Sequence, residues 1–347
     1  MSERRTLTRR MFEPTALDRQ APATKFITYA LLVIWSLVVL VPLYWVLITS
    51  FKNEGDVANG PFYLPFIDFR PKTDAWHFML VDNNTIGPYI NSVVVALGST
   101  FLAILIGSLA AYALVRIRFR AKLAMVGIFL LLLIAVIVAV AAFSVPWQIA
   151  LAVAIALFVI ALFTVGRRMK LALGNSDVEF WIISNRIMPP IVAVLPIYVM
   201  FQQLKLLDTQ FALIATYTAV NLPIVVWLTR DFFAAIPLDL EESAAIDGAS
   251  RLRVFFTIAL PLVRSGLVAT FLLVLILAWN EYLLALFLTN ADAQTMPVLV
   301  SAQNTTRGPQ WWNMSVLIVV MIAPVVIIAT FLQKHIARGL LVGAVKG

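Results

Sequence analysis

The stretch Glu242-Ser243-Ala244-Ala245-Ile246-Asp247-Gly248-Ala249 is followed, ten residues after its glycine, by Ile258-Ala259-Leu260-Pro261. It is the one long polar interruption in the second half of an otherwise strongly apolar chain. Acidic residues crowd the turn after Pro237, where the dipole of a beginning helix favours negative charge. Gly248 permits a sharp change of direction, and Pro261 ends or kinks the segment behind it. The pattern predicts an elbow of two helices between membrane-buried segments.

The rest of the chain predicts a membrane protein. Apolar residues make up 62% of its 347 residues and charged residues 13%, about half the charged share of a soluble domain. Eight apolar runs are long enough to cross a bilayer, which takes about 20 helical residues, and backbone in lipid must satisfy its own hydrogen bonds. The predicted fold class is therefore all-α, a polytopic transmembrane helical bundle. The runs are roughly 27–48, 91–115, 123–143, 147–166, 180–204, 211–229, 266–289 and 314–333.

The Lys and Arg residues predict the orientation of these spans. With the N-terminal tail inside, the inner segments hold twenty cations and the outer segments five, with Arg186 inside a span. This positive-inside bias predicts that both termini and the elbow face the cytoplasm. The tail up to Lys25 lacks a short apolar core with a cleavage site, so the first run is predicted to be a true span. The net charge of +8 flanks the spans and does not indicate a nucleic-acid partner.

The two runs between 123 and 166 are broken only by Ser144-Val145-Pro146-Trp147-Gln148. One helix of this length would greatly overshoot the bilayer. Pro146 disfavours helix at Val145 and removes a backbone donor. A hairpin of two spans with a tight outer turn is therefore predicted, and it keeps the elbow inside. A re-entrant or interfacial arrangement is the alternative.

Several kinds of chemistry are excluded. The chain has no cysteine, so it has no disulfide, thiolate nucleophile or Cys-ligated metal site. Its two histidines, His77 and His335, lie far apart, which argues against a metal or catalytic cluster. No Gly-x-x-x-x-Gly-Lys-Ser/Thr phosphate loop is present. We therefore expect no catalytic residue, no metal site and no enzyme activity in this chain.

Two outer segments carry aromatic residues. Residues 51–89 are rich in Pro, Gly, Asn and Asp and contain Trp76 and Phe78, which suits a folded lid or a partner-binding surface. A loop that merely connects two helices is the alternative. The second outer segment, 290–310, ends at Trp311-Trp312, where an interfacial aromatic anchor is expected.

The elbow resembles the EAA loop of carbohydrate-class ABC importer permeases, and the chain is similar to the smaller maltose-type permease subunit. The resemblance covers roughly residues 26–120 and 176–347. Ser243 stands where alanine is more usual, and the hairpin of about 121–175 is additional to the family's six-span core. Further similar stretches are Trp181–Pro190, Leu206–Thr209, Leu222-Pro223, Trp279–Tyr282 and Gly339–Gly347.

The resemblance implies one of two permease subunits in a binding-protein-dependent importer for a sugar, polyol or sugar derivative. The six-span core and the two-span hairpin together would give the chain eight spans in the bacterial cytoplasmic (inner) membrane. The implied partners are a second permease subunit, an ATPase dimer that uses ATP and Mg, an extracytoplasmic solute-binding protein, the ligand and membrane lipid. No cofactor is expected to bind this chain directly.

The elbow is the expected site of coupling to the ATPase. Ala244 and Ala245 leave little side-chain bulk, so that another protein's backbone can approach closely. An ordinary cytoplasmic helix–turn–helix loop is the alternative. The residues expected to couple are Glu241, Glu242, Ser243, Ala244, Asp247, Gly248, Ala249, Arg251, Leu260 and Pro261.

Four polar residues within spans are candidates for the substrate path, because such residues are costly in lipid and often functional. Arg186, beside Pro189-Pro190, could face a cavity at a helix bend or snorkel to the interface. Glu281 and Asn280, next to Trp279, offer hydrogen-bonding groups of the kind that bind sugars. The alternative is that they form hydrogen bonds between helices. The four candidates are Arg186, Asn221, Asn280 and Glu281.

The predicted organisation is a cytoplasmic tail, a core in two parts, an inserted hairpin and a second tail. A rival hypothesis is an ion-coupled secondary transporter of a small polar solute, but it needs intramembrane carboxylates, and Glu281 is nearly alone. A structural or assembly role stays open for the hairpin. The boundaries are 1–25 (tail), 26–120 (core, outer loop 51–89), 121–175 (hairpin), 176–334 (core, coupling loop 237–261) and 335–347 (tail).

Overall fold

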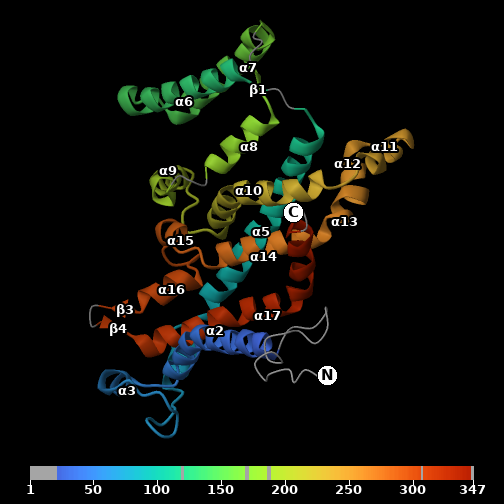
Figure 1. The fold of residues 1–347 in the computed structure, drawn as a ribbon. Helices are drawn as coiled ribbons and strands as arrows, with labels where there is room; N and C mark the ends of the chain where they lie inside the picture. Colours follow the sequence, from blue (N-terminus) through green and yellow to red (C-terminus); the bar gives the residue numbers. More distant parts are fainter. Residues whose placement is uncertain (1–21, 119–120, 169–171, 186–188, 306–307, 345–347) are drawn as a thin grey trace, which may run out of the picture. The chain divides into compact units, whose positions relative to one another are not determined.

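The computed structural model describes residues 22–118, 121–168, 172–185, 189–305 and 308–344, which are mostly helical (Figure 1). The chain divides into two compact units. The first comprises residues up to Tyr89 together with Thr295–Val326, and the second comprises Ile90–Gln294 with the residues from Ile327 onward. The predicted all-α fold class is confirmed as a mostly helical membrane protein.

The helices follow the apolar runs and the elbow of the sequence. The long helices are α2 (Pro22–Thr49), α5 (Ile86–Arg116), α6 (Leu123–Phe143), α7 (Trp147–Arg168), α10 (Gln210–Ala234) and α17 (Trp311–Ala344). The others are α3 (Glu54–Asn59), α4 (Asp74–His77), the π-helix η1 (Phe78–Asp82), α8 (Asn175–Ser184), α9 (Pro190–Gln203), α11 (Leu238–Ile246), α12 (Arg251–Val254), the π-helix η2 (Phe255–Ala259), α13 (Leu260–Leu262), α14 (Arg264–Trp279), α15 (Leu283–Leu288) and α16 (Met296–Ala302).

Among the described residues, six helices are long and apolar enough to cross a membrane: α2, α5, α6, α7, α10 and α17. A seventh span is present if the segment Arg251–Leu262 and α14, bent by 81°, are taken together. The structure thus supports a multi-pass membrane protein with six or seven candidate spans.

Two of the predicted runs are broken. The run 180–204 becomes α8 and α9, because Pro189 and Pro190 begin a new helix. The run 266–289 becomes α14 and α15, which are separated at Asn280–Tyr282. There the Glu281 carboxylate accepts a hydrogen bond from the backbone N–H of Leu284 at 3.0 Å and so caps α15.

In the first unit, the segment 51–89 is folded on itself and is more than a connection. Lys52 is buried, donates to the carbonyl of Phe62 at 2.6 Å, and lies 4.3 Å from the ring centroid of Trp45. A capping box between Asn53 and Asp56 begins α3. The core of this unit consists of Ala75, Met79, Met296, Leu299, Val316 and Leu317.

In the second unit, α5, α10 and α14 form the core. Buried Ala103, Val225 and Val274 pack together, one from each helix. Gly107 allows α5 to approach α10 closely, because a Cβ there would lie 2.5 Å from a methyl group of Val225. The hairpin turns where it was predicted to turn: α6 ends at Phe143, Ser144 has a left-handed φ of 51°, and α7 begins after Pro146.

Four short strands are present in the described residues, in two antiparallel pairs. β1 (Ala121–Lys122) pairs with β2 (Ala172–Leu173), which closes the base of the α6–α7 hairpin. In the first unit, β3 (Asn304–Thr305) pairs with β4 (Gly308–Pro309).

A single carboxylate fixes the loop after α15. Asp208, which lies between α9 and α10 with φ of 57°, accepts hydrogen bonds from the backbone N–H groups of residues 290–293, at 2.9 to 3.0 Å. Asn91 holds the same loop from α5, donating to the carbonyls of Asp292 and Gln294 at 2.8 and 3.0 Å. Burial alone would raise the pKa of Asp208, but the four backbone donors lower it to about 2.

We predict that Asp208→Asn destabilises the protein by about 2 kcal/mol, because the amide loses the charge that the four N–H groups bind. The folded pKa lies below the unfolded value. This contribution is therefore present above about pH 4 and is lost as pH falls through the folded pKa, near 2. Thermal unfolding in detergent should show a deficit that is constant from pH 5 to 8 and shrinks between pH 4 and 2. Asp292→Asn, at an exposed neighbour, is the control. A deficit that does not change between pH 4 and 2 would contradict this account.

Candidate functional site

The elbow has the local structure that its sequence predicts. α11 begins directly after Pro237, and Gly248 turns the chain with a left-handed φ of 81°, which a side chain rarely adopts. Ser250 then begins α12, its hydroxyl accepting from the N–H of Arg253 at 3.3 Å. The helix continues through η2 and α13 and bends by 81° into α14.

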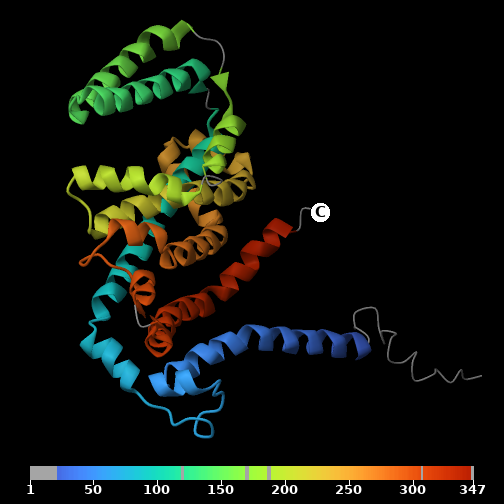
Figure 2. The same cartoon turned by 90° about the vertical axis from the view of Figure 1, so that its left-hand side faces the viewer.

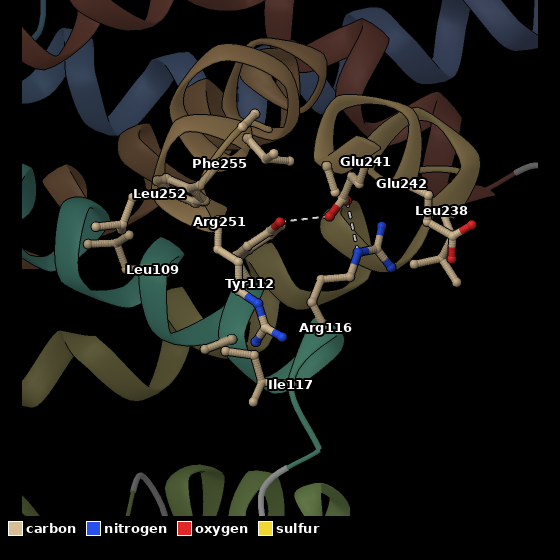
Figure 3. Close-up of a pocket in the computed structure, with 14 residues that line it drawn as sticks. Leu109, Tyr112, Arg116, Ile117, Leu238, Glu241, Glu242, Arg251, Leu252 and Phe255 are labelled. Atoms are coloured by element: carbon tan, nitrogen blue, oxygen red, sulfur yellow. Dashed lines mark hydrogen bonds and ion pairs between the residues drawn. The ribbon is translucent and has the colours of Figure 1, made fainter. Parts of the chain in front are cut away.

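The carboxylate of Glu241 joins the elbow to α5 (Figure 3). Its Oε2 accepts a hydrogen bond from the hydroxyl of Tyr112 at 2.6 Å, and its Oε1 accepts from Nε of Arg116 at 2.8 Å. Glu241 and Tyr112 are buried, and the Arg116 side chain is 12% exposed. Both carboxylate oxygens are therefore occupied, and the ion pair is largely withdrawn from water.

Arg116 also holds the end of α10. Its Nη2 donates to the carbonyls of Phe233 and Ile236, at 3.1 and 2.8 Å. These carbonyls lie in the last turn of α10 and just beyond it, where helices lack internal partners. One guanidinium thus connects α5, α10 and α11. We call Tyr112, Arg116 and Glu241 the latch.

An aromatic cluster packs beside the latch. The ring of Tyr112 lies 5.6 Å from that of Phe233 on α10 and 5.2 Å from that of Phe255 on η2. Phe233 and Phe255 lie 5.8 Å apart, and both are almost fully buried. These contacts bury apolar surface around the latch, and the low-dielectric surroundings strengthen its hydrogen bonds.

A groove of about 410 Å³ runs between α5 and the elbow. Leu109, Tyr112 and Arg116 line it from α5, and Glu242, Ala245 and Leu252 line it from the elbow. Within the described part of the chain, no group of three or more His, Asp and Glu side chains is arranged to hold a metal ion. The geometry is that of a two-helix elbow fixed to a helical bundle.

Comparison with known proteins agrees with this geometry. Residues 103–342 match the family described as binding-protein-dependent transport system inner membrane component. The chain belongs to this family. The match includes the latch, the hairpin and the elbow, and it makes the chain a multi-pass protein of the bacterial inner membrane.

Individual relatives are similar over almost the whole chain. The diacetylchitobiose uptake system permease protein NgcG of Streptomyces coelicolor is 28% identical over 90% of this chain and 85% of its own length. The trehalose/maltose transport system permease protein MalG of Thermococcus litoralis is 29% identical over 91% and 94%. The fold matches the crystal structure of a bacterial ABC transporter involved in the import of the acidic polysaccharide alginate. The TM-score is 0.62, with 20% identity over 91% of this chain and 97% of that one.

The structure places the ten predicted coupling residues of this permease on different faces of the elbow. Glu241 is buried and points to α5, away from solvent. The hydroxyl of Ser243 donates to the carbonyl of Asp239 at 2.7 Å, so this departure from alanine is satisfied within α11. Ala244, Ala249 and Leu260 are half-buried, and the exposed residues are Glu242, Ser243, Asp247, Gly248, Arg251 and Pro261.

Sequence reasoning missed three residues of this site. Nothing in the sequence around Tyr112 indicates a role in this site, and Arg116 was counted only as one of the inner cations. Ile246 is 87% exposed at the end of α11, an apolar side chain that faces solvent unless a partner covers it. Its position within the quoted stretch was the available signal.

The structure describes three of the four predicted substrate-path residues. Arg186 lies outside the described residues. Asn221 is buried and donates to the carbonyl of Tyr217 at 2.9 Å, and Asn280 donates to the carbonyl of Ile276 at 2.8 Å. Glu281 lines a cavity of about 400 Å³. Its other lining residues are Asn185, Pro190, Ala193, Ala219, Val220, Pro223 and Leu284.

We predict that Glu241→Gln destabilises the protein by about 3 kcal/mol, because it leaves the Arg116 guanidinium largely buried without its counter-ion. Tyr112→Phe should cost about 1.5 kcal/mol, the loss of one hydrogen bond to a charged acceptor. Thermal unfolding in detergent measures both. The matched control is Glu242→Gln, which changes an exposed neighbour and should leave Tm unchanged. Equal Tm values for Glu241→Gln and Glu242→Gln would contradict the role of the latch.

Proposed function

We propose that this chain is the permease subunit of a bacterial importer for a sugar, polyol or sugar derivative, with a di- or oligosaccharide as the favoured ligand. The relatives named above take up diacetylchitobiose and trehalose or maltose, which are neutral glycosides. The observation that carries the coupling part of the proposal is the latch. It fixes one face of α11 to the bundle and leaves the opposite face in solvent.

The exposed face of the elbow is the proposed contact for a cytoplasmic ATPase. It offers the carboxylates of Glu242 and Asp247 beside the apolar side chains of Ile246 and Leu252, which are 87% and 63% exposed. Such a mixture of apolar and charged groups is typical of a surface that becomes covered on assembly. The buried Glu241 would serve the same coupling from inside, by transmitting movement of α11 to α5 and α10.

The full assembly in this proposal contains a second permease subunit, an ATPase dimer that uses ATP and Mg, and an extracytoplasmic solute-binding protein. The chain itself would bind no cofactor. In the proposed topology it has eight spans and cytoplasmic termini, with α8 and α9 forming one interrupted span and α14 and α15 another. The excess of cations on the inner segments supports this orientation.

The cavity beside Glu281 is the proposed part of the ligand path. Glu281 and Asn185 are the polar residues of a lining that otherwise consists of apolar and proline residues. This small number of polar groups in a mostly apolar cavity suits recognition of hydroxyl groups. Alternating access would then follow when closure of the ATPases pulls the elbow and moves α5 and α10 with it.

An ion-coupled secondary transporter of a small polar solute is the rival. It predicts that the chain purifies alone and moves solute down an ion gradient. The scarcity of carboxylates within spans argues against it, because Glu281 is nearly alone there and its carboxylate caps α15 through the N–H of Leu284.

We predict that Gly248→Trp and Glu242→Lys each abolish ATP-driven uptake while the chain still inserts into the membrane. The first forces a bulky residue into a left-handed turn on the docking face, and the second reverses a docking charge. Uptake of maltose, trehalose and diacetylchitobiose is measured in proteoliposomes with the complete complex.

The matched control is Gly248→Asn, since Asn tolerates left-handed backbone better than other side chains and adds little bulk. It should retain most of the uptake. Wild-type uptake in both Gly248→Trp and Glu242→Lys would reject the docking proposal.

A further inference from the structure

Residues 63–69 of the first unit form a loop of apolar and aromatic side chains, in which Asp68 is the only charged residue. We call it the apolar loop. Phe66 and Ile67 are 83% and 79% exposed, and Leu64 is 50% exposed. Exposed apolar side chains gathered in this way are typical of a surface that contacts lipid or protein.

The backbone of the apolar loop satisfies its own hydrogen bonds. Two N–H groups, those of residues 63 and 64, donate to the carboxylate of Asp68 at 2.8 and 2.9 Å. The N–H groups of residues 66–68 donate to the carbonyls of Leu64 and Phe69 at 2.8 to 3.3 Å. Pro65 has no N–H. No N–H between residues 63 and 68 is therefore left for water or for a partner.

The turn at the tip is strained and firmly closed. Phe66 has a left-handed φ of 67°, which a bulky side chain rarely adopts. Pro65 and Phe69 form a β-bridge behind it, and Phe69 is 5% exposed, with its ring 5.1 Å from Nζ of Lys52. Strain that the surrounding structure maintains is typical of functional positions, and here it coincides with the most exposed apolar side chain of the loop.

The helix α2 places the edge of the membrane in this unit. Lys25 is the last charged residue before a continuous apolar run, which starts at Phe26. The hydrocarbon core takes about 20 helical residues, so it extends from Phe26 to about Trp45. Tyr44 and Trp45 are partly exposed aromatic residues at this boundary, where such residues are enriched.

The apolar loop folds back from the end of α2 to this boundary (Figure 2). The hydroxyl of Tyr44 donates to the carbonyl of Tyr63 at 2.7 Å, and the rings of Trp45 and Tyr63 lie 5.2 Å apart. Lys52 fixes the same arrangement, since its Nζ lies over the ring of Trp45 and donates to the carbonyl of Phe62 at 2.6 Å. The loop thus lies beside the last apolar turns of α2.

We propose that the apolar loop is a membrane anchor that inserts Leu64, Phe66 and Ile67 into the outer leaflet beside α2. Backbone that enters lipid must satisfy its hydrogen bonds internally, as residues 63–68 do. The N–H groups of Leu64 and Tyr63 lower the pKa of the exposed Asp68, with a further contribution from Lys52. The Asp68 carboxylate therefore stays charged at the level of the headgroups.

A soluble protein is the other class of partner that could cover the loop. Interfaces between proteins carry direct hydrogen bonds in addition to apolar contacts. The apolar loop offers such a partner no backbone N–H between residues 63 and 68, and it lies beside Trp45 at the membrane boundary. Both observations favour lipid.

Spin-label accessibility tests the anchor, because the chain has no native cysteine. A nitroxide at Ile67→Cys is measured in the full-length chain in phosphatidylcholine nanodiscs, with oxygen and a water-soluble nickel chelate as relaxing agents. Oxygen concentrates in lipid and the chelate stays in water, so we expect oxygen to relax this label more strongly. Ala58→Cys, exposed on α3 of the same segment, is the control and should be relaxed mainly by the chelate.

A second variant tests the apolar contact itself. Phe66→Asn keeps a residue that tolerates the left-handed turn but removes the aromatic ring. Combined with the label at position 67, it should shift relaxation from oxygen toward the chelate. Phe78→Asn removes another exposed ring of the segment, outside the apolar loop, and should leave the label at position 67 unchanged.

Two results would overturn the proposal. Stronger relaxation of the Ile67→Cys label by the chelate than by oxygen would show that the loop lies in water. If this water-accessible label were then shielded from both agents on addition of the solute-binding protein to the complete complex, the loop would be a protein docking site instead.

Discussion

The charge of Glu241 is withdrawn from water in the first turn of α11, a helix whose other face is exposed, and the structure depends on how that charge is satisfied. Tyr112 and Arg116, both from α5, occupy its two oxygens, and Arg116 also binds the carbonyls at the end of α10. A buried carboxylate without these partners would be strongly destabilising. The elbow is therefore constrained to one position on the bundle, and movement of α11 must involve α5 and α10.

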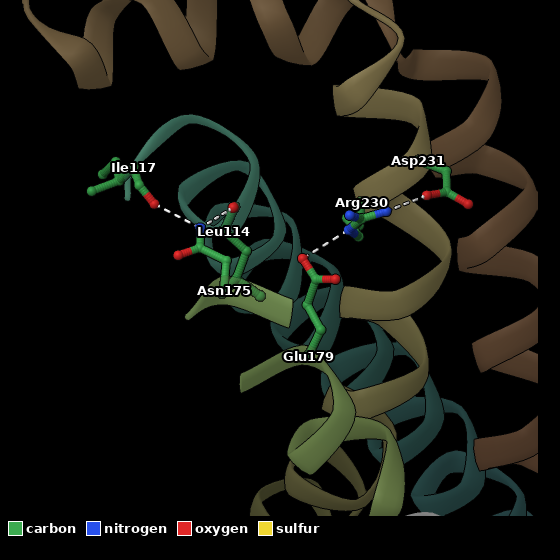
Figure 4. A network of polar contacts seen from close by, with 6 residues as sticks. All are labelled: Leu114, Ile117, Asn175, Glu179, Arg230 and Asp231. Carbon is green, nitrogen blue, oxygen red and sulfur yellow. Dashed lines mark hydrogen bonds and ion pairs between the residues drawn. The ribbon is translucent and has the colours of Figure 1, made fainter. Parts of the chain in front are cut away.

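The same principle recurs elsewhere in the second unit. Asp208 gathers four backbone N–H groups of the loop 290–293, and Glu179 fixes α8 to α10 through Arg230 (Figure 4). Each of these carboxylates joins segments that are distant in sequence. Contacts between apolar helices have little directional preference. In a chain so poor in charged residues, the few acidic groups therefore define how these helices are positioned.

The sequence predicted the helices well where the signal was local. The turn at Pro146, the elbow at Gly248 and the long apolar runs all depend on neighbouring residues. Contacts across the chain could not be predicted. Glu241 and Glu242 are adjacent acidic residues, but they lie about 100° apart around α11. Which of them faces inward depends on Tyr112 and Arg116, more than a hundred residues earlier. The break at Asn280–Tyr282 could not be predicted from hydropathy, which averages over a short polar interruption, and it depends on the Glu281 carboxylate that caps α15.

Cysteine labelling tests most directly whether the exposed face of the elbow contacts the ATPase, as we propose. Because the chain has no native cysteine, Ile246→Cys provides a single reactive site on that face. Its labelling by a water-soluble maleimide should fall sharply when the ATPase is assembled with the permease. Ala58→Cys, which is also exposed but lies in the segment 51–89, should label equally in both states. Equal labelling of Cys at position 246 with and without the ATPase would contradict the account.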